Sequence, residues 1–202
     1  MYKFFFKRVF DIIGALLLLP FVILEIVILA PFIWMVDRGP VFYNASRIGR
    51  KRELYKMFKL RSMYVNSPDY KNADGSTYNS DNDPRVTPIG RIMRKTSIDE
   101  FPQILNVLIG DMSFVGPRPR LPKSNTKWED LDEMHKKVYG LRPGITGYAQ
   151  AYYRNSITQE EKFRWDSYYA DHVSLWMDVK ILFRTFYSVI ARKNINTEQS
   201  DK

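Results

Sequence analysis

The hydrophobic pattern divides the chain into a long apolar segment near its start and a mixed remainder. Residues 12–36 are almost continuously apolar, and Glu25 is the only charged residue between Asp11 and Asp37. At about 1.5 Å per residue these positions reach about 37 Å as a straight helix, which is enough to cross a hydrocarbon core of about 30 Å. We therefore expect a membrane segment over residues 1–36, a second domain over 37–192 and a flexible tail over 193–202.

How this segment sits in the membrane depends on three features. Pro20 lies near the middle, removes a backbone hydrogen bond and predicts a break in the helix. Basic residues flank the segment on both sides, so the positive-inside rule favours neither orientation: Lys3, Lys7 and Arg8 before it, and Arg38, Arg47, Arg50, Lys51 and Arg52 after it. A re-entrant helix that breaks near Pro20 and a kinked anchor that spans the bilayer are then about equally supported. Glu25 favours the re-entrant path, because a carboxylate costs more at the bilayer centre than near a surface.

Beyond residue 37 the pattern predicts a mainly α fold with a small β element. Two alternating stretches within residues 40–65 suit a short hairpin, and the polar residues 66–88 suit a long loop. Helical spacing marks residues 90–109, 125–139, 158–171 and 174–192. In the last segment one face is apolar and basic residues lie elsewhere, with Leu175, Val179, Leu182, Phe186 and Val189 on the apolar face. We expect such amphipathic helices, and the basic and aromatic residues 1–11, at the membrane interface.

Composition excludes several kinds of chemistry and partner. The chain has no cysteine, which rules out thiolate catalysis and cysteine-ligated metals, and its two histidines, His135 and His172, are far apart in sequence. The net charge of +9 favours anionic partners: phosphate compounds, an anionic membrane surface or nucleic acid. Nucleic acid is not expected, because it would leave the membrane segment unexplained.

Candidate chemistry concentrates in residues 83–150. Asp99 and Glu100 are adjacent carboxylates that point about 100° apart on a helix, so they cannot share one proton as a facing pair. One can meet a substrate while the other orients it, holds a metal or moves a proton. The alternative is structural and stronger on spacing alone: Ser97 and Glu100 have the spacing of a capping box, and acids are ordinary in a first helical turn.

Several basic residues are candidates for binding phosphate. Arg118 lies between two prolines in GPRP, which fix the backbone around a guanidinium able to make bidentate contacts. Arg142 lies in RPGITG, whose glycines would let a ligand approach the backbone. Arg91, Arg94 and Lys95 occupy one helical turn and suit a solvated face or anionic lipid. Asp81 and Asp83 form a D-x-D pair that could hold a metal on a sugar nucleotide, although a chance turn is favoured in so polar a loop.

These motifs together resemble the bacterial sugar transferases, in particular the small monotopic phosphoglycosyl transferases. The resemblance covers essentially the whole chain. It rests on KR-F-D before the apolar segment, FKLRSM at 58–63, DPRVTPIGRIMRKTSIDEFPQ at 83–103, NVLIGDMSFVGPRP at 106–119, RPGITGYAQ at 142–150 and the block around Phe163, Asp166, Tyr168 and Tyr169. One departure is Leu19, where the family often has a serine before the helix-breaking proline.

The resemblance implies an enzyme at the cytoplasmic face of the inner membrane that initiates glycoconjugate assembly. It would move a phosphosugar from a UDP-sugar to polyprenyl phosphate, releasing UMP. Asp99 matches the family's nucleophile, which carries a covalent phosphosugar, and is the implied ligand of Mg²⁺. Glu100 matches the second member of the pair, with acid/base or positioning work. Phosphate or nucleotide would be bound by Arg118 and Arg142, with Lys59, Arg61 and Arg94 as weaker candidates.

Two other classes of function stay open at this point. One is a membrane-anchored basic adaptor that binds anionic lipid without catalysis. The other is a metal-dependent glycosyltransferase that uses Asp81 and Asp83 and releases UDP. Membrane lipids are partners in every case, and a homo-oligomer stays open as well.

Overall fold

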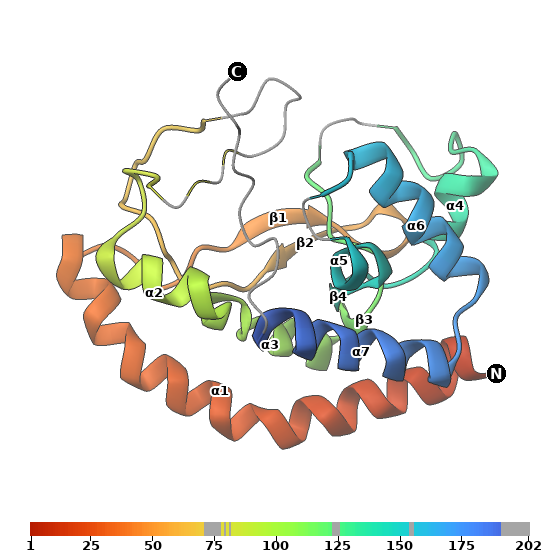
Figure 1. Ribbon diagram of the computed structural model, residues 1–202, viewed down its shortest axis with the longest axis horizontal. Coiled ribbons are helices and arrows are strands. Elements are labelled where there is room, and N and C mark those ends of the chain that lie inside the picture. Colours follow the sequence, from red (N-terminus) through yellow and green to blue (C-terminus); the bar gives the residue numbers. More distant parts are fainter. Residues whose placement is uncertain (71–77, 79, 81, 123–125, 154–155, 191–202) are drawn as a thin grey trace.

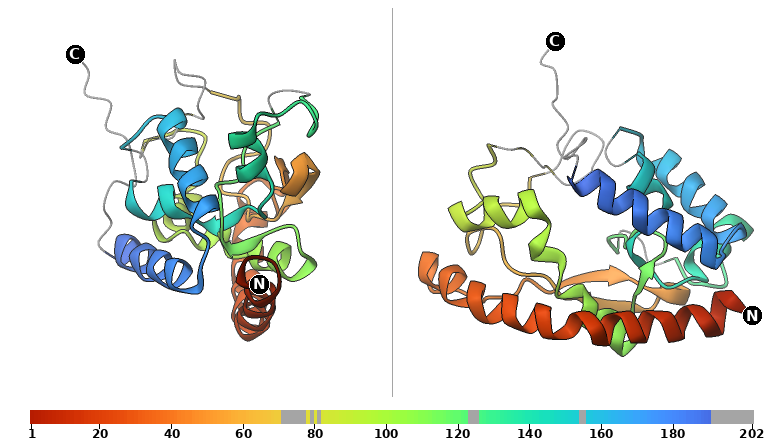
Figure 2. Two further views of the ribbon diagram at one scale, coloured as in Figure 1. Left: turned by 90° about the vertical axis from the view of Figure 1, so that its right-hand side faces the viewer. Right: turned by 60° about the horizontal axis from the view of Figure 1, so that its bottom comes forward.

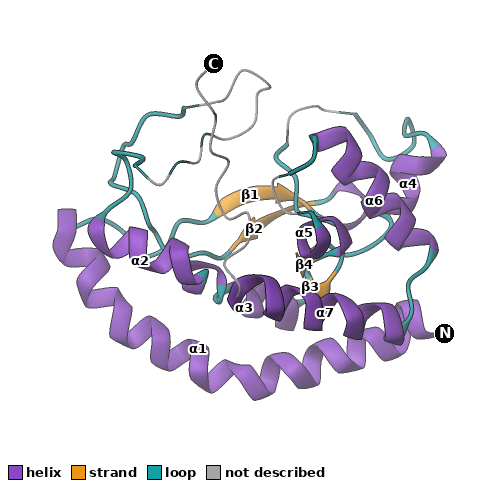
Figure 3. Cartoon of the chain, viewed as in Figure 1, coloured by secondary structure: helices purple, strands orange, loops and turns teal. Residues whose placement is uncertain are grey.

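A long N-terminal helix curves beneath a body of short helices and two small sheets (Figure 1). The computed structural model describes residues 1–70, 78, 80, 82–122, 126–153 and 156–190. One π-helical turn, Tyr2–Phe6, leads directly into α1, Lys7–Asp37. The expected mainly α fold with a small β element is confirmed (Figure 3). The predicted tail at 193–202 lies outside the described residues.

The predicted break near Pro20 is wrong, because α1 continues through both Pro20 and Pro31. The two prolines are eleven residues apart, close to three helical turns, and both are exposed. Each removes one hydrogen bond on the same face, so the helix bends without ending. Figure 1 shows the result as an arc whose concave side faces the body.

The two sheets each have two strands. β1, Ala45–Ile48, and β2, Leu54–Met57, form the predicted antiparallel hairpin, with Ala45 opposite Met57 and a 3-10 turn, Arg50–Arg52, at its tip. β3, Ser113–Val115, and β4, Gly144–Thr146, pair in parallel, which the sequence pattern did not indicate. A Cβ on Gly144 would lie 2.1 Å from the Gly116 backbone nitrogen. The RPGITG glycine therefore admits the protein's own backbone and not a ligand.

The remaining helices agree with the predicted segments near the C-terminal end and differ before it. Residues 90–109 divide into α2, Pro88–Thr96, a 3-10 turn, Ile98–Glu100, and α3, Gln103–Ile109, because Ser97 adopts a left-handed conformation. Within the described part of the segment 125–139, which begins at residue 126, only Glu133–Tyr139 is helical, as α4, with Asp132 capping its first turn. α5, Tyr148–Tyr152, was not predicted. α6, Gln159–Asp171, and α7, Leu175–Ile190, follow the two predicted C-terminal helices.

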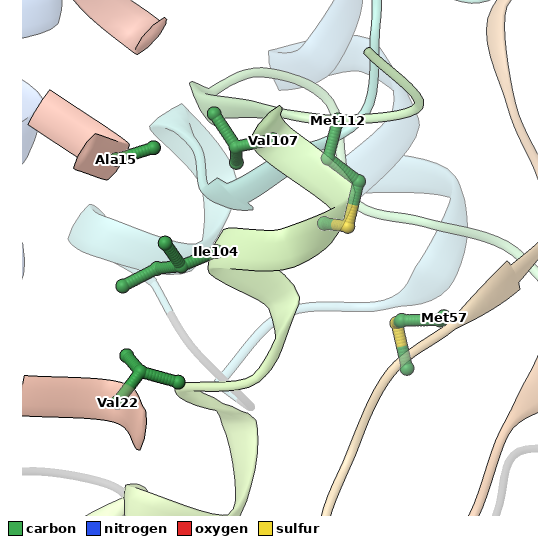
Figure 4. Packing of buried hydrophobic residues seen from close by; sticks show 6 residues of the cluster. All are labelled: Ala15, Val22, Met57, Ile104, Val107 and Met112. Atoms are coloured by element: carbon green, nitrogen blue, oxygen red, sulfur yellow. The ribbon is translucent and has the colours of Figure 1, made fainter. Parts of the chain in front are cut away.

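The apolar core joins α1 to the rest of the chain. One cluster brings Ala15 and Val22 of α1 against β2 and α3, and its other members are Met57, Ile104, Val107 and Met112 (Figure 4). A second cluster packs Ile33 of α1 against Leu60 and Met93. The apolar N-terminal helix and the body therefore share buried side chains along most of the helix.

Polar contacts fix α1 at both ends. Near its start, Tyr2 Oη and Lys7 Nζ each donate to Asp178 Oδ2 of α7 at 2.6 Å. At its end, Arg61 donates to both oxygens of Asp37 at 2.7 Å and to the Ile33 carbonyl at 3.1 Å. Two distant parts of one body therefore hold the two ends of the helix.

α7 packs against the body through a narrow side that includes Asp178 and Ile181, and it exposes most of its large apolar side chains. Asp178 and Ile181 are buried, and Thr185 bonds to Thr146 of β4 at 2.6 Å. The exposed side chains include Lys180 and Arg184 as well as several large apolar ones: Leu175, Trp176, Leu182, Phe183, Phe186 and Tyr187. α1 and α7 border the same side of the molecule in Figure 1 and in the left view of Figure 2. Among the described residues Tyr2–Asp37 is the one helix with the length and apolar composition to cross a bilayer.

Candidate active site

Asp99 lies in the 3-10 turn between α2 and α3 and is only 2% exposed. Ser97 turns the chain with a φ of 58°, and its side chain makes no capping hydrogen bond. The Asp99 carbonyl accepts from the Leu60 backbone N–H at 2.9 Å, which fixes the turn against the chain beyond β2. The capping-box interpretation of Ser97 and Glu100 is therefore wrong, and the carboxylates point elsewhere.

Lys59 lies between the two carboxylates. Its Nζ is 3.0 Å from Asp99 Oδ2 and donates to Glu100 Oε1 at 3.1 Å. The contact with Asp99 has the distance of an ion pair but not the direction of a hydrogen bond. The enclosed Oδ2 thus has no hydrogen-bond partner among the described residues. One lysine therefore faces both carboxylates and offsets part of their negative charge.

The neighbouring carboxylates differ in electrostatic environment. Burial raises the pKa of Asp99, and the charge of Lys59 opposes that rise while the charge of Glu100 adds to it. The charge of Lys59 lowers the pKa of Glu100 against the effect of burial, and Arg118 lowers it further. Glu100 is therefore held as an anion more firmly than Asp99.

A third carboxylate comes from α1. Both oxygens of Glu25 are enclosed and have no hydrogen-bond partner among the described residues. Glu25 lies near enough to Asp99 for their charges to interact. The signal in the sequence was that Glu25 is the single carboxylate of an apolar run. A carboxylate is costly to insert in a membrane and so marks a functional position. Glu25 served to predict the path of the helix, but its position near Asp99 was not predicted.

Two of the predicted arginines lie around the pair. Arg94 of α2 donates from Nε to Ser62 Oγ at 2.9 Å, and its charge lowers the pKa of Asp99. Arg118 is exposed, and its charge acts on Glu100. Lys59, Arg94 and Arg118 thus give the pair a cationic surrounding, which suits phosphate groups.

Two other predicted residues have different surroundings. Arg61 holds the end of α1 through Asp37, and its guanidinium also donates to the carbonyls of Pro40, Ile33 and Met63. Arg142 donates from Nε to the Gly110 carbonyl at 2.7 Å, and its charged neighbours are Arg8, Arg50 and Asp11. No contact links either arginine to Asp99 or Glu100 among the described residues.

The D-x-D alternative has little structural support. Asp83 is buried and pairs with Arg85 through both carboxylate oxygens, the shortest contact being 2.6 Å. The Arg85 hydrogen bonds hold the pKa of Asp83 below its usual value. Asp81 lies outside the described residues. In the described part of the chain no group of three or more His, Asp or Glu side chains has the arrangement of a metal site.

Comparison with known families gives the class of protein to which this fold and site belong. Residues 2–192 match the family model described as bacterial sugar transferase. The chain belongs to that family.

Named relatives agree with this assignment. The chain is 38% identical over 202 residues to a UDP-galactose-lipid carrier transferase of Erwinia amylovora, covering 93% of this chain and 41% of the relative. It is 35% identical over 205 residues to an undecaprenyl-phosphate galactose phosphotransferase of Salmonella typhimurium, with 93% and 41% covered. A UDP-glucose:undecaprenyl-phosphate glucose-1-phosphate transferase of Escherichia coli K12 is 35% identical over 192 residues, with 93% and 40% covered. The chain thus spans about two fifths of the length of these relatives.

Proposed function

We propose that this chain transfers a phosphosugar from a UDP-sugar to polyprenyl phosphate, giving a polyprenyl-diphosphate-sugar and UMP. The observation that carries the proposal is the enclosed Asp99 carboxylate, which has an oxygen without a hydrogen-bond partner among the described residues and cations around it. Family membership supports it, as do relatives whose names specify UDP-galactose, UDP-glucose and undecaprenyl phosphate.

The proposed chemistry has two displacements at phosphorus. A carboxylate oxygen of Asp99 attacks the phosphorus that carries the sugar, and the bond from that phosphorus to the oxygen of UMP breaks. UMP leaves with the bonding electrons. An oxygen of the lipid phosphate then attacks the aspartyl phosphosugar and releases the Asp99 carboxylate. Splitting the transfer lets two anionic substrates react in turn instead of meeting directly.

Each neighbour of Asp99 has a role in this scheme. Lys59 keeps Asp99 anionic against burial and screens it from Glu100. Arg118 and Arg94 offer charge to the phosphates of the donor, and Arg118 is exposed and so accessible to it. Glu100 stays ionised and orients Lys59 or accepts a proton. Arg61 acts indirectly, by holding the end of α1.

Mg²⁺ suits this set of oxygens. Magnesium is usually bound by one or two carboxylates together with substrate phosphate oxygens. The Asp99 oxygen and both Glu25 oxygens are enclosed without hydrogen-bond partners among the described residues, and Glu25 is charge-coupled to Asp99. We propose Asp99 as the protein ligand, with Glu25 next to it. Bound there, the ion would offset the charge of the diphosphate facing a carboxylate.

The membrane arrangement that we propose is re-entrant, with α1 bent into the cytoplasmic leaflet of the inner membrane. The support is that Asp178 and Arg61, on one body, hold opposite ends of α1. α7, which exposes several large apolar side chains, lies on the same side of the molecule as α1 (Figure 2). Interfacial contact by both helices would keep Asp99 at the depth of a lipid phosphate, while the prenyl chain stays in the bilayer.

The reaction products test this function against its alternatives. Full-length protein in nanodiscs with polyprenyl phosphate and Mg²⁺ would be given a panel of UDP-sugars. We expect UMP and a lipid-linked diphosphosugar from one or a few donors. Release of UDP would support a glycosyltransferase instead, and no turnover with any donor would support the adaptor.

A further inference from the structure

A second cationic site lies beside the N-terminal end of α1. A shallow recess there is lined by basic residues from the N-terminal π-helical turn and α1, from the tip of the β1–β2 hairpin and from the segment before β4: Lys3, Lys7, Arg8, Arg50 and Arg142. One carboxylate, Asp11, also lines it. The balance of charge is strongly positive, as expected of an anion site.

Some of these side chains are occupied by structural contacts. Arg8 uses both terminal nitrogens on the Val107 and Leu108 carbonyls near the end of α3. Lys7 pairs with Asp178. Asp11 Oδ1 accepts from Ser113 Oγ and from the Phe114 backbone N–H, at 3.1 and 3.0 Å. These contacts attach α1 to the body. They do not account for the positive charges of Arg50 and Arg142.

Arg50 and Arg142 are oriented but not neutralised. Each donates from Nε to a backbone carbonyl, Arg50 to Gly140 at 3.1 Å and Arg142 to Gly110 at 2.7 Å. Neither forms an ion pair or a further hydrogen bond within the described part of the chain. The two terminal nitrogens of each guanidinium therefore remain available. Burial and the like charges of Arg8 and Arg50 lower the pKa of Arg142. A bound anion would relieve this repulsion, and a forked guanidinium suits phosphate oxygens.

Aromatic residues place this recess where a membrane surface would lie. Phe4, Phe5, Phe6 and Phe10 are exposed along the same end of α1. Arg50 lies 5.7 Å and Lys3 5.8 Å from the centre of the Phe4 ring. Aromatic rings beside basic residues are typical of the interfacial layer of a bilayer, where lipid phosphates are found.

The recess is separate from the candidate active site. Arg8 lies at the recess, whereas Glu25, which is near enough to Asp99 for their charges to interact, lies seventeen residues further along the same helix. At 1.5 Å per residue the two positions are about 25 Å apart. A phosphate held in the recess is therefore not the one that reacts at Asp99.

We propose that Arg50 and Arg142 bind the phosphate of an anionic membrane lipid headgroup in this recess, and so hold the N-terminal end of α1 at the membrane surface. The shared chemistry is a phosphate group, which a soluble anion could also supply. The experiment has an arm for each source.

Lipid retention in nanodiscs tests the proposal. Full-length protein would be placed in phosphatidylcholine nanodiscs with a minor fraction of phosphatidylglycerol, and the lipid that stays bound would be counted by native mass spectrometry. We expect wild type to retain phosphatidylglycerol and Arg50→Gln and Arg142→Gln to retain about tenfold less. Arg164→Gln removes the charge of an exposed arginine on α6 and should match wild type. Two variants are used because loss of the Arg142 bond to Gly110 can weaken folding, which a melting curve detects.

Two results would overturn the proposal. One is equal retention of phosphatidylglycerol by wild type and by a folded Arg50→Gln variant. The other concerns protein in nanodiscs that contain no phosphatidylglycerol. There, added inorganic phosphate would raise the melting temperature as much as phosphatidylglycerol does in the mixed nanodiscs, and both variants would lose this rise to the same extent. That second result would assign the recess to a soluble anion.

Discussion

Asp99 and Glu100 are neighbours in the chain but differ in what surrounds them. Asp99 is 2% exposed and loses solvation, whereas Glu100 has a side chain that is 38% exposed and donors on two sides. Pairs of carboxylates whose pKa values move apart are characteristic of sites where each has a different task. We therefore propose Asp99 as the nucleophile of the two, because it is the less stabilised as an anion.

Removal of the Asp99 charge should abolish turnover. Asp99→Asn keeps the shape of the side chain but has no anionic oxygen to attack phosphorus, so UMP release should fall to background while the protein stays folded. Asp130→Asn, at an exposed position, is the matched control. A residual rate within about tenfold of wild type, about 1.4 kcal/mol in barrier, would mean that Asp99 is not the nucleophile.

The acid limb of the pH–rate profile should report the charges beside Asp99. The pKa of Asp99 is raised by burial, lowered by Lys59 and raised by Glu100. In the proposed mechanism only the ionised form of Asp99 attacks, so activity should be lost as pH falls through that pKa. Lys59→Gln should therefore move the acid limb of kcat/KM to higher pH, and Glu100→Gln should move it to lower pH. Lys95→Gln, on the exposed side of α2, should leave it in place.

These opposite shifts separate Asp99 from Glu100 as the titrating group. If Glu100 carried the limb, Glu100→Gln would remove it instead of displacing it. An acid limb that stays fixed in both variants would contradict the assignment of Asp99.

The contribution of Arg118 to activity should depend on the geometry of its guanidinium as well as on its charge. Arg118→Lys keeps the charge but cannot make forked contacts to a phosphate, so kcat/KM should fall strongly. Arg91→Lys is the matched conservative change at an exposed arginine. Unchanged kinetics in Arg118→Lys would limit Arg118 to a general electrostatic role.

At the scale of elements, α7 shows that an apolar stripe need not face a core. Its stripe points outward, and its attachment to the body runs through Asp178, Ile181 and Thr185. This orientation follows from partners elsewhere: Lys7 and Tyr169 both donate to Asp178, which draws the polar side inward. The exposed stripe is then available to lipid.

Substitutions on the two sides of α7 should separate membrane binding from stability. Phe183 and Phe186 are 73% and 68% exposed, so changing both to Ser should lower partitioning into vesicles with little change in melting temperature. Ile181 is fully buried, and Ile181→Ala should cost about 2–5 kcal/mol of unfolding free energy. Equal partitioning of wild type and the double variant would show that α7 does not touch the bilayer.

The sequence predicted elements better than contacts. The hairpin and the two C-terminal helices have clear periodicity, whereas the division between α2 and α3 depends on a left-handed Ser97, a conformation that serine does not signal. Lys59 and Arg61 are two residues apart and equally basic, but one reaches Asp99 and the other holds Asp37. Arg118 and Arg142 also look alike in sequence. Their roles differ because packing between distant segments decides which charge each one meets.

At the scale of the whole molecule, the attachment of both ends of α1 to one body predicts a single-sided topology. Tyr2→Cys creates the chain's only thiol. In intact cells this thiol should resist a membrane-impermeant reagent, and it should react once the cells are opened. The separate variant Asp130→Cys, at an exposed position, should behave in the same way, because we place both positions on the cytoplasmic side. If intact cells show labelling of the Tyr2→Cys variant but not of the Asp130→Cys variant, α1 is a spanning anchor. That outcome would not bear on the chemistry at Asp99.

The pairing of Lys7 with Asp178 also has a consequence for biosynthesis. The two residues are 171 positions apart, so the apolar N-terminal helix leaves the ribosome long before α7 exists to receive it. At about 5–20 residues per second the interval is roughly 10–30 s. During that time the ion pair between Lys7 and Asp178 cannot form, and α3, against which α1 packs in the core, is made only partway through the interval. A nascent chain of this protein therefore needs cover from lipid or from a chaperone before its own body can supply it.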